Sequence, residues 1–364
     1  MRNNHVSIII IPELEYIYNK VYLVDMDKVA IVILNWNGAS MMRKFLPGVV
    51  KHSSGEATVY VADNGSTDES LALLESKFPT VRVIAFRENY GFAEGYNQAL
   101  ARIEAEYYLL LNSDVEVRAG WLTPLLAYMD SHPGVAACQP KILSQAEHDT
   151  FEYAGAAGGY MDCWGYPYCR GRIFSTVEKD NGQYDTPQSV FWATGAALLV
   201  RSEAYREVGG LDGRFFAHME EIDFCWRLRS RGYGIACVPS AAVYHVGGGT
   251  LAKENPRKTF LNFRNNLLML YKNLPEEDLW RILWIRFGLD MLALCSFLLT
   301  GKWKDSRAVW RAWRAFRKMK SDFAEERKVI QGKAVLHSIP EMADFSILYR
   351  YHVKRERFFS ELPR

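Results

Sequence analysis

The segment 108–117, YLLLNSDVEV, runs from apolar residues directly into Asn112, Ser113 and Asp114. An amide, a hydroxyl and a carboxylate at the end of a buried strand have two interpretations. Asn, Ser and Asp are common turn residues, so they could simply end the strand. They could also offer oxygen ligands to a divalent cation such as Mg²⁺ or Mn²⁺ held against a diphosphate, because hard cations prefer oxygen donors.

Other ionisable residues with candidate chemistry lie far away in the sequence. Glu220, Glu221 and Asp223 begin a helix-like segment, and crowding of three carboxylates raises the pKa of at least one of them, as a general base requires. The alternative is that acidic residues favour a helix start, with Asp223 pairing Arg227 one turn later. His245 could bind a metal or donate to a diphosphate, although a lone histidine is more often structural.

The elements that must position these residues alternate between strands and helices. Apolar runs at 29–36, 57–64, 81–88 and 107–114 predict strands, and segments starting at residues 40, 68 and 92 predict helices. Segment 40–52 is expected to break near Pro47, and Ser66 and Thr67 are expected to cap the next helix. This order predicts a mostly parallel sheet whose strand carboxyl ends form a binding crevice.

The composition is that of a globular protein, with 49% hydrophobic and 24% charged residues over 364 positions. A net charge of +2 gives no general argument for a nucleic-acid partner. The six cysteines form no CxxC pair, which argues against zinc-ribbon and thioredoxin-like sites and favours reduced thiols in a cytosolic protein.

The two ends of the chain differ from its middle. Met26 resembles a second start, so we expect residues 1–25 to be a non-native or disordered extension, residues 26–270 to form the main domain and residues 271–364 a helical region. Segment 279–303 is apolar but interrupted by charges, which favours an interfacial or packed helix over a spanning one. Segment 302–320 has eight Lys or Arg against one Asp, interleaved with tryptophans. It predicts contact with an anionic membrane surface; the alternative is a basic helix that packs its aromatic residues on the protein.

Seven motifs in a fixed order carry a family resemblance. They are VILNWNG, VADNGSTDES, ENYGFAEGYNQAL, LLLNSDVEV, TGAALLVR, FFAHMEEIDFCWRLRSRGY and VYHVGGGT. Together, over residues 28–270, they resemble an inverting glycosyltransferase of family 2 with the GT-A fold, and the subgroup is similar to bacterial rhamnosyltransferase-like enzymes. The resemblance implies a Rossmann-like α/β domain with a mixed, mostly parallel sheet flanked by helices, followed by a C-terminal helical extension.

The resemblance also implies roles for individual residues. Asp63 would accept the imide N–H of a uracil or thymine ring, although its DNGSTD context also suits a turn. Asn112 stands where the family has the first Asp of a DxD motif, which leaves Asp114 as the direct metal ligand. Glu221 stands where Asp is usual and would be the base. The implied nucleotide-sugar contacts are Asn35, Asn37, Asp63, Asn64, Ser66, Asn89, Gly91, Asn97, Asn112 and Ser113. The implied catalytic group is Glu221 with Glu220 and Asp223, the metal ligands are Asp114 and His245, and the acceptor contacts are Trp192, Thr194 and Gly195.

The implied activity is transfer of a sugar from a dTDP- or UDP-linked donor, with Mg²⁺ or Mn²⁺, to a saccharide or polyprenyl-diphosphate-linked acceptor. That enzyme would work in cell-surface polysaccharide synthesis, at the inner face of a bacterial cell membrane and without nucleic acid. Two alternatives stay open. One is a sugar nucleotidyltransferase, although NWNGAS after the first strand lacks the basic Gly-rich loop of that class. The other is a catalytically inactive sugar- or membrane-binding module, which Asn112 and Glu221 keep open. Gly247–Gly249 are expected to belong to a lid over the donor.

Overall fold

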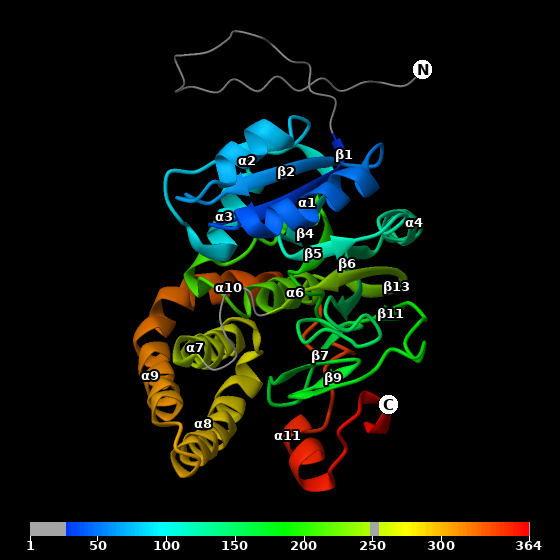
Figure 1. Cartoon of the computed structure of the whole chain (residues 1–364). Helices are drawn as coiled ribbons and strands as arrows, with labels where there is room; N and C mark the ends of the chain where they lie inside the picture. Colours follow the sequence, from blue (N-terminus) through cyan, green and yellow to red (C-terminus); the bar gives the residue numbers. More distant parts are fainter. Residues whose placement is uncertain (1–26, 248–254, 364) are drawn as a thin grey trace.

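The computed structural model describes residues 27–247 and 255–363, and its centre is a nine-stranded mixed sheet. The strand order is β11-β13-β6-β12-β4-β1-β2-β3, with β5 paired to β13. The expected extension at residues 1–25 and most of the expected lid lie outside the described residues. Figure 1 shows most of this sheet in the upper part of the molecule, helices α8 and α9 at the lower left and α11 at the lower right.

One half of the sheet follows the predicted alternation of strands and helices. Its elements are β1 (Asp27–Asn35), α1 (Ala39–Ser53), β2 (Thr58–Asp63), α2 (Ser70–Lys77), β3 (Arg82–Ala85), α3 (Gly91–Leu100) and β4 (Ala105–Asn112). β1 pairs in parallel with both β2 and β4, and β2 pairs in parallel with β3. Polar residues that end these strands therefore meet at one edge.

The second half contains the antiparallel pairings. Its elements are β5 (Val115–Val117), α4 (Thr123–Ser131), β6 (Val135–Ser144), β11 (Gln188–Ser189), β12 (Ala197–Arg201), α5 (Ser202–Glu207) and β13 (Gly234–His245). β12 runs antiparallel between β4 and β6, and β6 pairs in parallel with β13. The end of β13 also pairs antiparallel with β5, which follows directly after the polar end of β4.

The sheet has an apolar core on each face, as the alternation of side chains along β1 requires. Val29, Ile31 and Ile33 face the core formed with α1, α2 and α4. Ala30 and Val32 face the larger core, to which α3, α5, α6 (Glu220–Ser230) and α7 (Pro256–Asn273) contribute. This layered arrangement is the predicted α/β architecture.

The remaining elements lie at the lower side of the molecule in Figure 1. A small antiparallel sheet contains β7 (Gly159–Met161), β8 (Pro167–Cys169), β9 (Arg172–Ile173) and β10 (Thr176–Val177). The C-terminal helices are α8 (Glu276–Leu299), α9 (Trp303–Met319), α10 (Ala324–Lys333) and α11 (Ile347–Tyr349). Short helical turns are η1 (Gly213–Phe215), η2 (Lys320–Phe323), η3 (Arg350–Lys354) and η4 (Phe359–Glu361).

Two local predictions need correction, and a third stays untested. α1 continues through Pro47 without a break, and its face with Met42, Leu46 and Val49 stays buried. α2 starts at Ser70 rather than after Ser66, because Asp68 accepts the backbone N–H of Ser70 at 3.0 Å. The predicted domain boundary at residue 270 falls inside α7, so the division into two domains stays a prediction.

α8 is the helix among the described residues that is long and apolar enough to cross a membrane by length and composition. Its buried side carries Arg286 and Asp290, 3.4 Å apart, and Trp313 of α9 donates to Asp290 at 3.0 Å. Arg286 and Asp290 therefore face the protein, whereas Arg281 near the start of α8 is exposed, and α9 packs part of its aromatic side against α8.

Candidate active site

The predicted polar strand ends lie next to one another. The register pairs Asn35 at the end of β1 with Asp63 at the end of β2, and Leu34 with Asn112 at the end of β4. A Cβ placed on Gly38 would lie 2.4 Å from Asn35 Oδ1 and 3.7 Å from Ser113 Oγ, so β1 and β4 converge closely just after their last residues. We call this edge, defined by Asn35, Asp63, Asn112, Ser113 and Asp114, the strand-end site.

Asp63 is held firmly in the strand-end site. Its side chain accepts from Asn35 Nδ2 at 2.9 Å and from the backbone N–H of Ser66 at 2.9 Å. Asn35 also donates to Ser66 Oγ at 3.2 Å. The Asn35 Oδ1 atom is buried, and no described residue donates to it. The structure therefore brings three of the predicted nucleotide contacts together and fixes the orientation of the carboxylate.

Asn64 and Asn89 tie the end of β2 to the start of α3. Asn64 Nδ2 donates to Asn89 Oδ1 at 3.0 Å and to Gly91 O at 2.9 Å, and Asn89 accepts the backbone N–H of Gly91 at 2.8 Å. Gly91 has φ 80°, and a Cβ there would meet the ring of Phe216 at 3.0 Å. Glycine is therefore required where this loop approaches the segment before α6.

Asn37 and Asn97 serve other contacts. Asn37 Oδ1 accepts the backbone N–H of Thr67 at 2.7 Å and so joins the loops after β1 and β2. Asn97 accepts from the hydroxyl of Tyr205 at 2.7 Å and donates to Leu211 O at 2.7 Å. The side chain of Asn97 thus braces α3 against the segment after α5, and these bonds explain its position without a nucleotide.

Asp114 and His245 are in direct contact. Asp114 Oδ1 lies 3.1 Å from His245 Nε2, and His245 Nδ1 lies 3.2 Å from Glu152 Oε2. Burial alone would lower the pKa of His245, but the two carboxylates outweigh it and raise that pKa to about 10. Burial alone would raise the pKa of Asp114, but the hydrogen bond and charge of His245 hold it below its usual value.

The Asp114–His245 pair fits a divalent cation only in part. Carboxylate oxygen and imidazole nitrogen are both suitable donors, and both atoms can reach one point. Among residues 27–247 and 255–363, no group of three or more His, Cys, Asp or Glu side chains is arranged to hold a metal. An ion here would have to replace the proton between the two side chains, and further ligands would have to come from a phosphate group or water.

In the acidic pair at the start of α6, Glu220 is buried and Glu221 is half-buried. Burial, followed by the charge of Glu221, raises the pKa of Glu220 well above its usual value. Burial also raises the pKa of Glu221. An Oε2 atom of each carboxylate is buried without a hydrogen-bond partner among the described residues. A Cβ on Gly195 would lie 3.8 Å from Glu221 Cβ, so Glu221 lies beside the segment that precedes β12.

Asp223, predicted to support the base, has a different environment. It is fully buried and bonds to Arg227 Nε at 2.9 Å, Lys272 Nζ at 2.9 Å and Asn273 Nδ2 at 2.8 Å. The predicted helix pair between Asp223 and Arg227 is therefore present. With these cationic and amide partners, Asp223 anchors α6 and is closed to a sugar hydroxyl.

Two of the three predicted acceptor contacts also bond within the protein core. Trp192 is 4% exposed and donates from Nε1 to Tyr160 O at 3.1 Å, which makes it a core residue. Thr194 is 2% exposed and accepts the backbone N–H of Ala196 at 3.2 Å. Gly195 is buried as well, but it lies next to Glu221, whereas the Trp192 and Thr194 side chains bond within the core.

Three residues of this region were not predicted from the sequence. Glu152 reaches His245 from an irregular segment that carries no motif. Asn265 and Lys272 of α7 bond to the loop before α6 and to Asp223. Polar residues at buried positions of an amphipathic helix could have indicated the last two, because such groups require specific partners.

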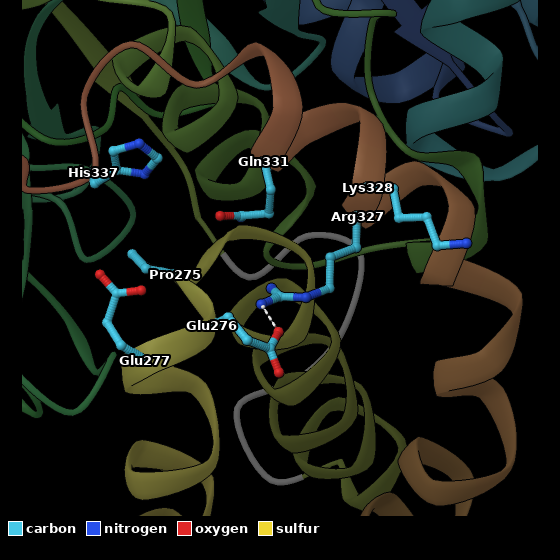
Figure 2. Close-up of a pocket in the computed structure, with 7 residues that line it drawn as sticks. All are labelled: Pro275, Glu276, Glu277, Arg327, Lys328, Gln331 and His337. Atoms are coloured by element: carbon cyan, nitrogen blue, oxygen red, sulfur yellow. Dashed lines mark hydrogen bonds and ion pairs between the residues drawn. The ribbon is translucent and has the colours of Figure 1, made fainter.

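A separate surface pocket lies where α8 starts. Its lining consists of Pro275, Glu276, Glu277, Arg327, Lys328, Gln331 and His337, and Figure 2 shows Arg327 of α10 pointing to Glu276, to which it bonds at 2.8 Å. None of these residues belongs to the strand-end site or to the acidic pair. The pocket is a hollow between C-terminal helices.

The comparison with protein families decides the class of protein. Residues 30–209 match the family described as Glycosyl transferase family 2. The chain belongs to glycosyltransferase family 2. The predicted rhamnosyltransferase-like resemblance and the prediction of a glycosyltransferase are both confirmed. In this glycosyltransferase the match contains the strand-end site, whereas α6, α7 and His245 lie beyond it.

Curated relatives agree with this family. The chain is 27% identical over 237 residues to the N-acetylglucosaminyl-diphospho-decaprenol L-rhamnosyltransferase of Mycobacterium tuberculosis, covering 60% of this chain and 76% of that protein. It is 23% identical over 254 residues to the low-salt glycan biosynthesis hexosyltransferase Agl10 of Haloferax volcanii, covering 68% of this chain and 77% of that protein.

Solved structures confirm the GT-A fold. The chain aligns with S. aureus TarS 1-349 in complex with UDP-GlcNAc at a TM-score of 0.53 and 15% identity, over 84% of each chain. It aligns with GalNAc-T7, solved with UDP, GalNAc and Mn²⁺, at 0.53 and 16%, over 68% of this chain and 48% of that one. The mannosyltransferase PcManGT from Pyrobaculum calidifontis, with GDP-Man and Mn²⁺, aligns at 0.50 and 13%, over 86% and 87%.

Proposed function

We propose that this glycosyltransferase is an inverting, divalent-cation-dependent enzyme of cell-surface polysaccharide synthesis. It takes a sugar from a dTDP- or UDP-linked donor and transfers it to a saccharide or polyprenyl-diphosphate-linked acceptor. Rhamnose is the donor sugar we favour, since the relative from M. tuberculosis is named an L-rhamnosyltransferase that acts on a decaprenol diphosphate. The observation that supports this proposal most strongly is the contact of Asp114 with His245 beside the fixed carboxylate of Asp63.

The strand-end site would hold the nucleoside diphosphate. Asp63, fixed by Asn35 and Ser66, presents a carboxylate that can accept the imide N–H of uracil or thymine. Asp114 and His245 would hold Mg²⁺ or Mn²⁺; the neighbours GalNAc-T7 and PcManGT were solved with Mn²⁺. A divalent cation bound there neutralises charge on the departing diphosphate. Asn112, whose amide lies 3.4 Å from His245 Nε2, would orient that imidazole.

The acidic pair would act on the acceptor. Glu221 takes the proton of the acceptor hydroxyl as that oxygen attacks the anomeric carbon. The bond from the anomeric carbon to the diphosphate oxygen breaks on the opposite face, so the product has inverted configuration. A raised pKa, caused by burial, strengthens Glu221 as a base. Burial and the charge of Glu221 raise the pKa of Glu220 further, so Glu220 would hold a proton beside the base. Asp223 acts only through α6, because all its contacts are structural.

We further propose that the helical hairpin α8–α9 contacts an anionic membrane at the inner face of the cell. Residues 291–299, MLALCSFLL, form the second half of α8, and none of them is buried. Leu292 is 68% exposed and Leu299 is 90% exposed, and Trp303 at the turn is 68% exposed. Basic residues of α9 continue from this apolar tip, which is the arrangement that binds an anionic interface.

The tip of the hairpin is a better candidate for membrane contact than α9 as a whole. Trp313 and Phe316 of α9 are buried against neighbouring helices, as the alternative interpretation expected, whereas Trp303 and Trp310 are exposed. An acceptor on a polyprenyl diphosphate lies at the membrane surface. Contact of the hairpin with lipid would bring the enzyme to that acceptor.

Nucleotide binding with and without metal tests the catalytic proposal. Isothermal titration with UDP and dTDP should show binding that strengthens with Mn²⁺ and that loses this dependence in Asp114→Ala. A donor screen with a lipid-linked acceptor should then release the matching nucleoside diphosphate. Binding that ignores both Mn²⁺ and the Asp114→Ala change would instead indicate an inactive sugar-binding module.

Sedimentation with vesicles tests the membrane proposal. The protein should sediment with phosphatidylglycerol vesicles and not with phosphatidylcholine vesicles, and Leu292→Glu should reduce the bound fraction. Leu71→Glu is the matched control, because Leu71 is an exposed leucine, 41% accessible, on α2. Equal loss in both variants, or binding that is independent of lipid charge, would contradict the proposal.

A further inference from the structure

The segment between η1 and α6 is strained. Phe216, His218 and Met219 have φ values of 67°, 71° and 73°, a region that side chains other than glycine rarely adopt. Such conformations persist only where surrounding contacts impose them, and they are concentrated at functional sites. We call residues 216–219 the left-handed loop. It ends directly at Glu220 and Glu221, so its shape sets where α6 begins.

Asn265 of α7 bonds to the backbone of the left-handed loop and of the residue before it, while Arg257 of α7 lies over the ring of Phe216. Asn265 is fully buried, and its Nδ2 donates to Phe215 O at 3.0 Å, Ala217 O at 2.8 Å and His218 O at 2.8 Å. Its Oδ1 accepts from Arg264 Nε at 2.8 Å, which fixes the orientation of the amide. Three carbonyls of one short loop thus converge on one amide group.

The other side of the left-handed loop faces the nucleotide-binding half. The backbone N–H of Phe92, at the start of α3, donates to Phe216 O at 3.1 Å. The ring of Phe216 also lies against Gly91. The loop therefore lies between α3 and α7, and Asn265 decides its shape from the side that belongs to the C-terminal region.

A second set of α7 contacts fixes the body of α6. Lys272 Nζ, which is fully buried, bonds to Asp223 at 2.9 Å and to Asp212 at 2.6 Å. Asn273 donates to Asp223 at 2.8 Å. Because α6 is already anchored by these bonds, the contribution specific to Asn265 is the conformation of the loop that leads into the acidic pair.

We infer that Asn265 is a positioning residue for the reaction: it imposes the left-handed loop and so places Glu221 beside Gly195. This inference rests on the proposed role of Glu221 as the base. Asn265 touches no reacting atom. Its effect on catalysis passes entirely through the geometry of residues 216–221.

The test compares two neighbouring asparagines in the full-length protein. Asn266 is also buried on α7, but it bonds to Gly165 O and Arg286, away from the left-handed loop. Asn265→Ala should lower kcat about 100-fold, since a small misplacement of a catalytic group has effects of that order. KM for the donor and metal-dependent UDP or dTDP binding should be retained. Asn266→Ala should lower the melting temperature by a similar amount and leave kcat nearly unchanged.

Each result bears on the inference. Equal loss of kcat in both variants, or a folded Asn265→Ala variant with full kcat, overturns it. If Asn265→Ala does not fold, Met219→Gly gives the same test from the loop. Glycine accepts the positive φ at that position and frees the loop. A reduced kcat at unchanged donor KM then supports the inference, and an unchanged kcat overturns it.

A parallel measurement on Glu221→Gln separates this inference from the proposed function. If Glu221→Gln stays active, the proposed base is wrong and the role of Asn265 fails with it. If Glu221→Gln is inactive while Asn265→Ala is fully active, only the positioning role is overturned.

Discussion

The strand-end site and the acidic pair are built in different ways. The strand-end site is held by residues of its own strands and loops, such as Asn35 on Asp63 and Asn64 on Asn89. The acidic pair depends on partners far along the chain, because α7 supplies Asn265 to the loop before α6 and Lys272 to Asp223. The Asp63 side of the sheet edge is held by its own strands and loops, although Asp114 contacts the remote His245, whereas the start of α6 in a strained loop needs support from α7.

This difference divides the enzyme by function. The strand-end site lies within residues 30–209, which match the family, whereas His245 and the acidic pair with its supports lie beyond them. Damage to α7 should therefore impair chemistry while nucleotide binding survives. Damage to the strand-end site should impair donor binding first.

Glu221→Gln should give the largest difference between an effect on kcat and an effect on nucleotide binding. Removing a general base lowers kcat by a factor on the order of 10³. UDP or dTDP binding measured by titration should stay at the level of the wild type, since the strand-end site is intact. Glu75→Gln, an exposed change on α2, is the control. Loss of nucleotide binding in Glu221→Gln would mean that the two regions are not independent.

Lys272→Met tests whether the acidic region depends on α7. The change removes the cation that Asp212 and Asp223 share, while each keeps an arginine partner, so the free energy of unfolding should fall by about 1.5–3 kcal/mol. Urea unfolding measures this loss, with the exposed Lys77→Met as control. A loss no larger than that of Lys77→Met would contradict the anchoring role of α7.

The same cluster predicts a pH effect on stability. Burial alone would raise the pKa of Asp212, but Arg214 and Lys272 hold it below the usual value of about 3.9. A depressed pKa in the folded state contributes stability that is present above the unfolded pKa and is lost as the pH falls towards the folded pKa. In acid unfolding below about pH 4, Lys272→Met should show a weaker dependence on pH than the wild type.

Asn35→Ala should act on the other region and more mildly. It removes one hydrogen bond to Asp63, which for a buried charged acceptor corresponds to about 1–3 kcal/mol, or roughly a tenfold or larger loss of nucleotide affinity. Titration with UDP or dTDP measures this effect, and kcat at saturating donor should change little. A lowered kcat with unchanged affinity would place Asn35 with the chemistry instead.

The smallest expected effect is a shift of the acid limb in the profile of kcat against pH. Burial raises the pKa of Glu221, and the base acts only when ionised, so kcat should rise with pH above about 4.3, the value of an ordinary glutamate. Asn35→Ala should leave that limb in place, because it acts on the other region. A limb at or below the ordinary value would contradict burial of the base in the working enzyme.

The sequence predicted the nucleotide half of this enzyme well because its signals are local. Alternating apolar segments indicated the sheet, and parallel strands necessarily bring Asp63 and Asp114 to one edge. Seven motifs in family order indicated the glycosyltransferase class, which the family match confirms.

Only the tertiary structure decided which polar residues serve the fold. Trp192, Asn97 and Asp223 carry the residue types of a site, but their buried partners come from remote segments. The contacts of Glu152 with His245 and of Asn265 with the left-handed loop could not be predicted from the sequence either, because each contact joins segments without a shared sequence pattern. Periodicity reports the face on which a residue lies, whereas the partner of a buried polar group is fixed by how distant elements pack.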